Sequence, residues 1–142
     1  MAAHATVIRK YAPGLEVTVG SWNARVLTDA MPGARGLWKD ACLSPYGGAL
    51  TIYHVHTYDW EGSYDAFSPF LHNCSDYLLS KQLLVAEYSQ AGGAGMTSQQ
   101  QYSYLFCRGY AGGFGWQAIG TGDDADTLAT LTTGMDSLPA PC

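Results

Sequence analysis

The sequence of 142 residues has few charged side chains and no run of basic ones. Charged residues make up 13% of it, and the formal net charge is −5. A nucleic-acid-binding surface needs clustered Lys and Arg, so these scattered cations exclude that class of partner. No apolar stretch reaches the length of about 20 residues that a membrane-spanning helix needs, and we expect no membrane partner.

Cysteine pairs with metal-binding spacing are also missing. Four cysteines stand far apart in the sequence: Cys42, Cys74, Cys107 and Cys142. This spacing argues against a structural zinc site. It leaves open two disulfides in a secreted protein or four buried thiols in a cytosolic one. Residues 1–10 lack the apolar core and cleavage site of a signal peptide, so none is expected there.

What the sequence does contain is a short apolar run that ends in a carboxylate, at residues 83–89. A strand that is apolar on both faces is typical of a sheet covered by helices. Simple alternation places Val85 and Glu87 on one face and turns Leu84 and Ala86 toward the helices. Glu87 then lies at the C-terminal end of the strand, where α/β enzymes carry their chemistry.

Strands alternate with helices along the whole sequence. After a helix at residues 2–11, strands are expected near 15–20, 50–58, 83–88 and 112–117. Helices are expected near 34–44, 68–80 and 98–108, and from Asp123 or Asp124 onward. This order predicts a parallel sheet with right-handed crossovers. We expect one domain over residues 1–138, with a coil tail at 139–142.

The C-terminal ends of these strands carry residues that resemble a known family. His56-Thr57-Tyr58 ends the second strand, Glu87 ends the third, and Trp116 follows the fourth. In this order they resemble the last strands of clan A (β/α)8 glycoside hydrolases, closest to the family five cellulases and β-mannanases. The resemblance implies an α/β fold, the parallel (βα)4 C-terminal half of a TIM barrel, preceded by one helix.

The resemblance also implies roles for individual side chains in a retaining, endo-β-1,4-mannanase-like or glucanase-like reaction without a cofactor. Glu87 is expected to be the nucleophile, Tyr58 to orient it through a hydrogen bond, and His56 to contact a sugar hydroxyl. Sugar rings are expected to stack on three tryptophans: Trp116, Trp22 and Trp60. The predicted ligand is a β-linked polysaccharide or oligosaccharide, and the predicted location is extracellular.

One part of the family pattern has no counterpart here. The general acid/base of the family is a Glu that follows Asn at the end of the fourth barrel strand, and no such pair occurs in this chain. A full barrel takes about 250 residues, whereas this sequence has room for four βα units. We therefore expect a nucleophile without its acid/base, in a chain that is inactive alone. The two open sheet edges predict a homodimer, a complementing N-terminal half barrel, or aggregation. The sequence is equally compatible with a natural half barrel and with a truncated piece of a longer protein.

Two other functions compete with a glycoside hydrolase fragment. A carbohydrate-binding or interaction module would keep the tryptophans and lose catalysis. A metal site is the third possibility, because His54 and His56 lie on one strand face at a spacing seen in metal-dependent hydrolases. We predict no bound metal, and expect His54 to be an interior histidine.

Overall fold

The structure is a computed structural model that describes residues 1–138, so the tail predicted at 139–142 lies outside it. The helices are α1 (Ala2–Tyr11), α2 (Asp40–Leu43), α3 (Tyr64–Phe67), α4 (Ser98–Cys107) and α5 (Leu128–Asp136). The strands are β1 (Gly20–Ser21), β2 (Tyr53–His56), β3 (Leu83–Tyr88) and β4 (Gly112–Gly115). Short 3₁₀ turns lie at Ala24–Val26, Ser44–Tyr46 and Cys74–Tyr77.

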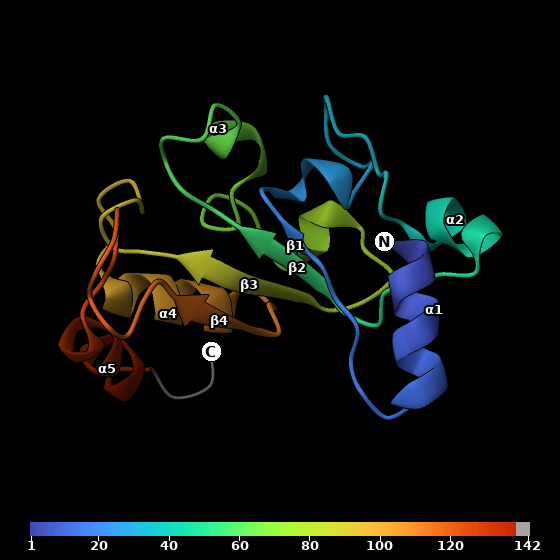
Figure 1. The fold of residues 1–142 in the computed structure, drawn as a ribbon. Coiled ribbons are helices and arrows are strands. Elements are labelled where there is room, and N and C mark those ends of the chain that lie inside the picture. Colours follow the sequence, from blue (N-terminus) through green and yellow to red (C-terminus); the bar gives the residue numbers. More distant parts are fainter. Residues whose placement is uncertain (139–142) are drawn as a thin grey trace.

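The four strands form one parallel sheet in the order β1-β2-β3-β4, so β1 and β4 are its edges (Figure 1). The helices α4 and α5 pack on each other beside β4, and α1 stands beside the segment that leads into β1 (Figure 1). One face of the sheet is covered by helices, and we call the other its open face. Within residues 1–138, no helix combines the length and apolar character needed to cross a membrane.

A β-bulge in β3 changes the direction in which its last residues face. Val55 pairs with Val85, but the next residue, His56, pairs with Glu87, which leaves Ala86 as an extra residue. The pairing of β3 with β4 shifts over the same stretch. A bulge of this kind inserts one unpaired residue and re-aims the side chains that follow it.

The bulge overturns the predicted facing of β3. Val85 is fully buried on the helix-covered face, while Leu84 and Ala86 are half-exposed. The prediction that Leu84 and Ala86 pack toward the helices is therefore wrong. Because the bulge adds one residue, Glu87 returns to the open face, and Tyr88 turns into the core with none of its surface exposed.

The helix predicted at residues 68–80 does not form. This stretch contains the 3₁₀ turn Cys74–Tyr77, and the residues before the turn are irregular. The hydroxyl of Tyr110 donates to the carbonyl of Pro69 at 3.0 Å and to that of His72 at 2.8 Å. The backbone of this stretch forms turns, as in the bond from the N–H of Leu71 to the carbonyl of Ser68 at 3.0 Å, and the bonds from Tyr110 hold these turns against the rest of the fold.

The helix predicted at residues 34–44 is reduced to the four residues of α2. Gly36 has a left-handed φ of 53°, which is incompatible with a right-handed helix. The backbone N–H of Trp38 donates to the carbonyl of Val26 at 3.0 Å, so this segment is tied to the turn after β1.

The strand predicted at residues 15–20 pairs as a regular ladder at Gly20–Ser21. Before that point one backbone bond remains, from the N–H of Thr51 to the carbonyl of Val17 at 2.8 Å, and the Thr51 hydroxyl accepts from the N–H of Val17 at 2.6 Å. By contrast, the helix predicted at 98–108 is confirmed as α4.

Glycines in β4 allow the helices to approach the sheet closely. A Cβ atom at Gly113 would lie 2.5 Å from Leu105 of α4 and 2.7 Å from the hydroxyl of Tyr88. A Cβ atom at Gly115 would lie 2.3 Å from Leu131 of α5. Real Cβ atoms do not come this close, so β4 can sit here only without side chains at these two positions.

The Gly113→Ala substitution is therefore expected to destabilise the fold. Overpacking a filled core costs about 1–3 kcal/mol of the free energy of unfolding, which urea denaturation measures. Gly14→Ala is the matched control, because a Cβ there meets nothing within 4 Å. That variant should be neutral or more stable by less than about 1 kcal/mol, and equal losses in both variants would contradict the packing described here.

Candidate active site

Glu87 lies on the open face at the C-terminal end of β3, and both of its carboxylate oxygens have a neighbour. The hydroxyl of Tyr58 donates to Oε1 at 3.0 Å. The Nδ1 atom of His56 lies 3.4 Å from Oε2. Two neighbours on two different oxygens fix the plane of the carboxylate as well as its position. The structure thus brings together three of the side chains predicted for the site.

Tyr58 is suited to remain a hydrogen-bond donor. Its side chain is buried, and the residue is 3% exposed. Burial, followed by the negative charge of Glu87, raises the pKa of the Tyr58 hydroxyl far above its ordinary value of 10.0. Tyr58 therefore keeps its proton at any physiological pH and presents it to Glu87.

His56 is held by close packing on the same face. Its ring lies over Gly20 of β1, where an added Cβ would be 3.0 Å from Nε2. The ring of His54 packs against it with centroids 5.0 Å apart. Burial and the adjacent His56 lower the pKa of His54, although Glu87 opposes this shift. His54 is therefore neutral at physiological pH.

The histidine pair does not form part of a metal cluster in the described part of the chain. Across residues 1–138, no three His, Cys, Asp or Glu side chains lie together in a way that would hold a metal ion. The spacing of His54 and His56 instead serves packing on one strand face, with the His56 ring next to Glu87.

Two of the predicted tryptophans join Tyr58 in a row of aromatic rings. Trp60 stacks on Tyr58 with centroids 5.2 Å apart, and Trp22 lies 5.5 Å beyond Trp60. The indole N–H of Trp60 donates to Oδ2 of Asp124 at 2.7 Å, which fixes its ring. Trp22 and Trp60 are more than half exposed, so both present ring surface to a ligand.

The third predicted tryptophan is separate from this row. Trp116 directly follows β4, on the other side of the strand that bears Glu87, and is 37% exposed. The backbone N–H of Trp116 donates to the carbonyl of Tyr88 at 2.6 Å, and its backbone carbonyl accepts from the N–H of Asp126 at 2.7 Å. The backbone at Trp116 is thus held beside the end of β3.

Glu61 is a buried carboxyl group that the sequence did not reveal. The residue is 5% exposed, and neither carboxyl oxygen has a hydrogen-bond partner within residues 1–138. Burial, followed by the charge of Glu87, raises the pKa of Glu61 to about 8. From the sequence, Glu61 lies in a stretch with Asp59 and Asp65 that could swing over the site, and no local pattern places any of the three.

The site therefore contains one accessible carboxylate and one sealed carboxyl. Retaining glycoside hydrolysis needs two carboxyl groups about 5–5.5 Å apart that both reach the substrate. The carboxylate of Glu87 is accessible to a substrate, whereas the oxygens of Glu61 are closed off from solvent and thus from a sugar. The geometry can orient a nucleophile, but the described residues do not offer it an acid/base.

The cysteines follow neither of the two patterns considered from the sequence. Cys42 and Cys74 are free thiols. Cys107 is disulfide-bonded. The protein thus combines a disulfide with free thiols, which neither the arrangement of two disulfides nor that of four thiols describes.

The chain is similar to proteins named as mannanases. It is 41% identical to the mannan endo-1,4-beta-mannosidase of Mytilus edulis over 116 residues, which cover 79% of this chain and 31% of that protein. It is 35% identical to the protein of the same name from Cryptopygus antarcticus over 127 residues, which cover 86% of this chain and 33% of that protein. No family model matches the sequence.

Solved structures show the same similarity. The endo-1,4-beta-mannanase from Eisenia fetida superimposes with a TM-score of 0.88 at 38% identity, over 96% of this chain and 38% of that one. The beta-mannanase of Mytilus edulis gives a TM-score of 0.83 at 35% identity, over the same shares of the two chains.

The chain spans about a third of the length of the relatives it matches. The predicted resemblance to the C-terminal half of a clan A (β/α)8 glycoside hydrolase is confirmed, and the parallel four-stranded sheet is half of a TIM barrel.

The Glu61→Gln substitution is expected to change how stability depends on pH. Burial raises the pKa of Glu61 from 4.5 to about 8 in the folded protein. Between these two values the folded state binds a proton that the unfolded state has lost, so the free energy of unfolding falls as pH rises. A glutamine amide does not titrate, so the variant does not show this decrease in the free energy of unfolding. Thermal unfolding should therefore show a smaller decrease of the midpoint from about pH 5 to about pH 9 in the variant.

Asp65→Asn is the matched control, because Asp65 is an exposed carboxylate in α3, four residues after Glu61. It should keep the pH dependence of the parent chain. If all three proteins lose stability equally between the two pH values, Glu61 is ionised in the folded state and the assignment fails.

Proposed function

We propose that this chain is the nucleophile-bearing half of a retaining endo-β-1,4-mannanase-like glycoside hydrolase. The observation that carries the proposal is the carboxylate of Glu87. It lies on the open face at a strand end, with a hydrogen bond from Tyr58 and a contact to His56. The similarity of the chain to proteins named mannan endo-1,4-beta-mannosidase supports it and favours a mannan over other β-linked polymers as substrate.

In this proposal Glu87 attacks the anomeric carbon and forms a covalent glycosyl-enzyme intermediate. The leaving oxygen takes a proton from an acid/base carboxyl outside this chain, and the same group then activates the water that releases the sugar. The hydrogen bond from Tyr58 keeps the attacking oxygen in line. His56 contacts a hydroxyl of the sugar, and its packing over Gly20 limits its motion.

The tryptophans supply the binding surface. Sugar rings have an apolar face that stacks on aromatic rings, and an indole buries a large apolar area with few rotatable bonds. Trp116 serves the sugar at the cleavage point, because it follows the strand next to Glu87. Trp22 and Trp60 serve sugars farther along the polymer.

The proposal requires a second carboxyl group from outside these 142 residues, either from a partner or from another part of the same protein. Both edge strands of the sheet are unpaired on one side, which favours strand pairing with another polypeptide. A complementing N-terminal half barrel fits this requirement, since it would close the sheet and bring the missing acid/base. A homodimer would close the sheet without adding that carboxyl group.

A non-catalytic carbohydrate-binding module is the second candidate. The sealed position of Glu61 and the exposed rings of Trp22 and Trp60 favour it, because binding needs the rings and not the second carboxyl. Either function places the protein outside the cell, where polysaccharides occur. The disulfide-bonded Cys107 supports that location, because disulfides persist in oxidising compartments.

A chimera tests the catalytic proposal. The chain replaces its matching segment in the Mytilus edulis mannan endo-1,4-beta-mannosidase, so that the host supplies the rest of the barrel. We expect the chimera to hydrolyse mannan, with a loss of kcat on the order of 10⁴-fold or more when Glu87 is changed to Ala. Reducing-sugar release measures the rate.

The control variant in the chimera is Glu16→Ala, an exposed carboxylate that precedes β1 at the opposite end of the sheet. It should keep full activity. A folded chimera whose activity is unaffected by Glu87→Ala would disprove the assignment of the nucleophile.

The isolated chain separates the two candidate functions. Because it lacks the base that activates water to release the sugar, we expect no turnover of an activated aryl β-mannoside above the rate of its Glu87→Ala variant. Binding of mannohexaose, measured by calorimetry, should survive Glu87→Ala and weaken about tenfold in Trp116→Ala, since aromatic contacts contribute on the order of 1 kcal/mol each. Turnover by the isolated chain that Glu87→Ala abolishes would contradict the expected inactivity, because an activated leaving group needs little protonation and tests the nucleophile alone.

A further inference from the structure

A pocket at the C-terminal end of β1 is separate from the carboxylate of Glu87. It has a volume of about 260 Å³ and lies between the turn after β1 and the loop that precedes α2. Its walls include two arginines and two tryptophans: Arg25, Arg35, Trp22 and Trp38. Of its lining residues, only Trp22 has a role in the function proposed above, and the two arginines have none.

The pocket is positively charged in a protein that is otherwise acidic. Two of the seven Lys and Arg residues line it, and none of its lining residues is Asp or Glu. Neither arginine forms an ion pair within residues 1–138. The nearest carboxylate in the loop, Asp29, is already paired with Lys39. The positive charge of the pocket is therefore not neutralised by the described part of the chain.

The two arginines are held next to each other by the backbone. The N–H of Arg35 donates to the carbonyl of Arg25 at 2.8 Å. The Nε atom of Arg25 donates to the carbonyl of Gly33 at 2.9 Å, which fixes the direction of its guanidinium group. The terminal nitrogens of Arg25 and the whole side chain of Arg35 remain available to a ligand.

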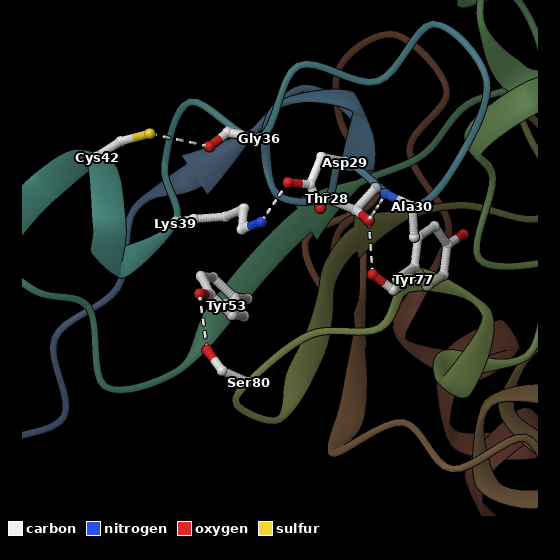
Figure 2. A network of polar contacts seen from close by, with 9 residues as sticks. All are labelled: Thr28, Asp29, Ala30, Gly36, Lys39, Cys42, Tyr53, Tyr77 and Ser80. Carbon is white, nitrogen blue, oxygen red and sulfur yellow. Dashed lines mark hydrogen bonds and ion pairs between the residues drawn. The ribbon is translucent and has the colours of Figure 1, made fainter.

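The loop that forms the pocket is fixed by bonds to the rest of the fold (Figure 2). The hydroxyl of Thr28 donates to the carbonyl of Tyr77 at 2.6 Å and accepts from the N–H of Ala30 at 3.0 Å. Lys39 pairs with Asp29 across the loop (Figure 2). The pocket is therefore formed before any ligand binds, which reduces the entropy that binding would cost.

The pocket continues the row of aromatic rings that begins at Glu87. Tyr58 contacts Glu87, Trp60 stacks on Tyr58, and Trp22 packs against Trp60 and also lines the pocket. A polymer that lies along these rings from Glu87 reaches the two arginines at its far end.

We propose that this pocket binds an anionic substituent, a sulfate ester or a carboxylate, on a sugar unit remote from the cleavage point. Guanidinium groups bind both of these anions through paired, charge-assisted hydrogen bonds. The sugar ring itself packs on Trp22. The assignment rests on the proposed function, and it gives the substrate class as a mannan-type polymer with acidic groups.

Calorimetry on the intact chain tests the assignment with three ligands of equal length. These are mannohexaose, its sulfated derivative and its derivative oxidised to a carboxylate at one terminal unit. We expect the anionic ligands to bind about tenfold more tightly than the neutral one at about 20 mM salt. The advantage should fall below about twofold at about 500 mM salt, because salt screens the charges. The ratio between the two anionic ligands identifies which group the pocket prefers.

Arg35→Gln should remove most of the advantage and leave the affinity for mannohexaose unchanged. Arg35 is exposed, so the variant should fold, and its thermal midpoint checks this. Lys10→Ala on α1 is the matched control, because it removes an exposed cation that does not line the pocket. It should keep the full advantage of the anionic ligands.

Three results would overturn the proposal. Equal affinity for neutral and anionic ligands would remove the anion site while leaving mannan binding, and so the proposed function, intact. Failure to bind any of the three ligands would remove both together. If methyl sulfate alone bound as tightly as the sulfated oligosaccharide, the pocket would bind free anions and would not be a polysaccharide site.

Discussion

The direction of the Glu87 side chain depends on one extra residue in β3. Without the bulge, alternation would place Glu87 on the face of Val85, in the core and under α4. With it, Glu87 pairs with His56 on the open face, and Tyr88 becomes a core residue. The hydrogen bond from Tyr58 and the contact with His56 both require this facing. The same inserted residue therefore serves the packing of the core and the exposure of the carboxylate.

The alternation of strands and helices, the parallel sheet and the end of β3 at Glu87 were accessible from the sequence, because each rests on a local pattern. The helix predicted at 98–108 is another such case, because the capping box of Thr97 and Gln100 that begins α4 is also a local pattern. The facing of β3 was not accessible. A bulge is defined by the register of a strand against its two neighbouring strands. The sequence of β3 alone does not determine that register.

Dependence on contacts remote in sequence also explains the other differences between the predicted and the observed structure. The burial of a carboxyl group between strands, such as Glu61, cannot be predicted unless the surrounding fold is known. The stretch at residues 68–80 was predicted to be a helix, yet its conformation is held by the bonds from the hydroxyl of Tyr110 to Pro69 and His72. In both cases the deciding interaction joins residues remote in sequence, and local propensity contains no information about it.

Tyr110 also has a consequence for how the protein folds. Its hydroxyl bonds to Pro69 and His72 span about forty positions of the chain, and Tyr110 itself lies between α4 and β4. The loop at 68–73 has only short turns of its own, so its position depends on the packing of the segment that bears Tyr110. Contacts of such high sequence separation slow folding. The loop and the α4–β4 unit should therefore form one cooperative segment, which opens and closes as a whole in amide hydrogen exchange.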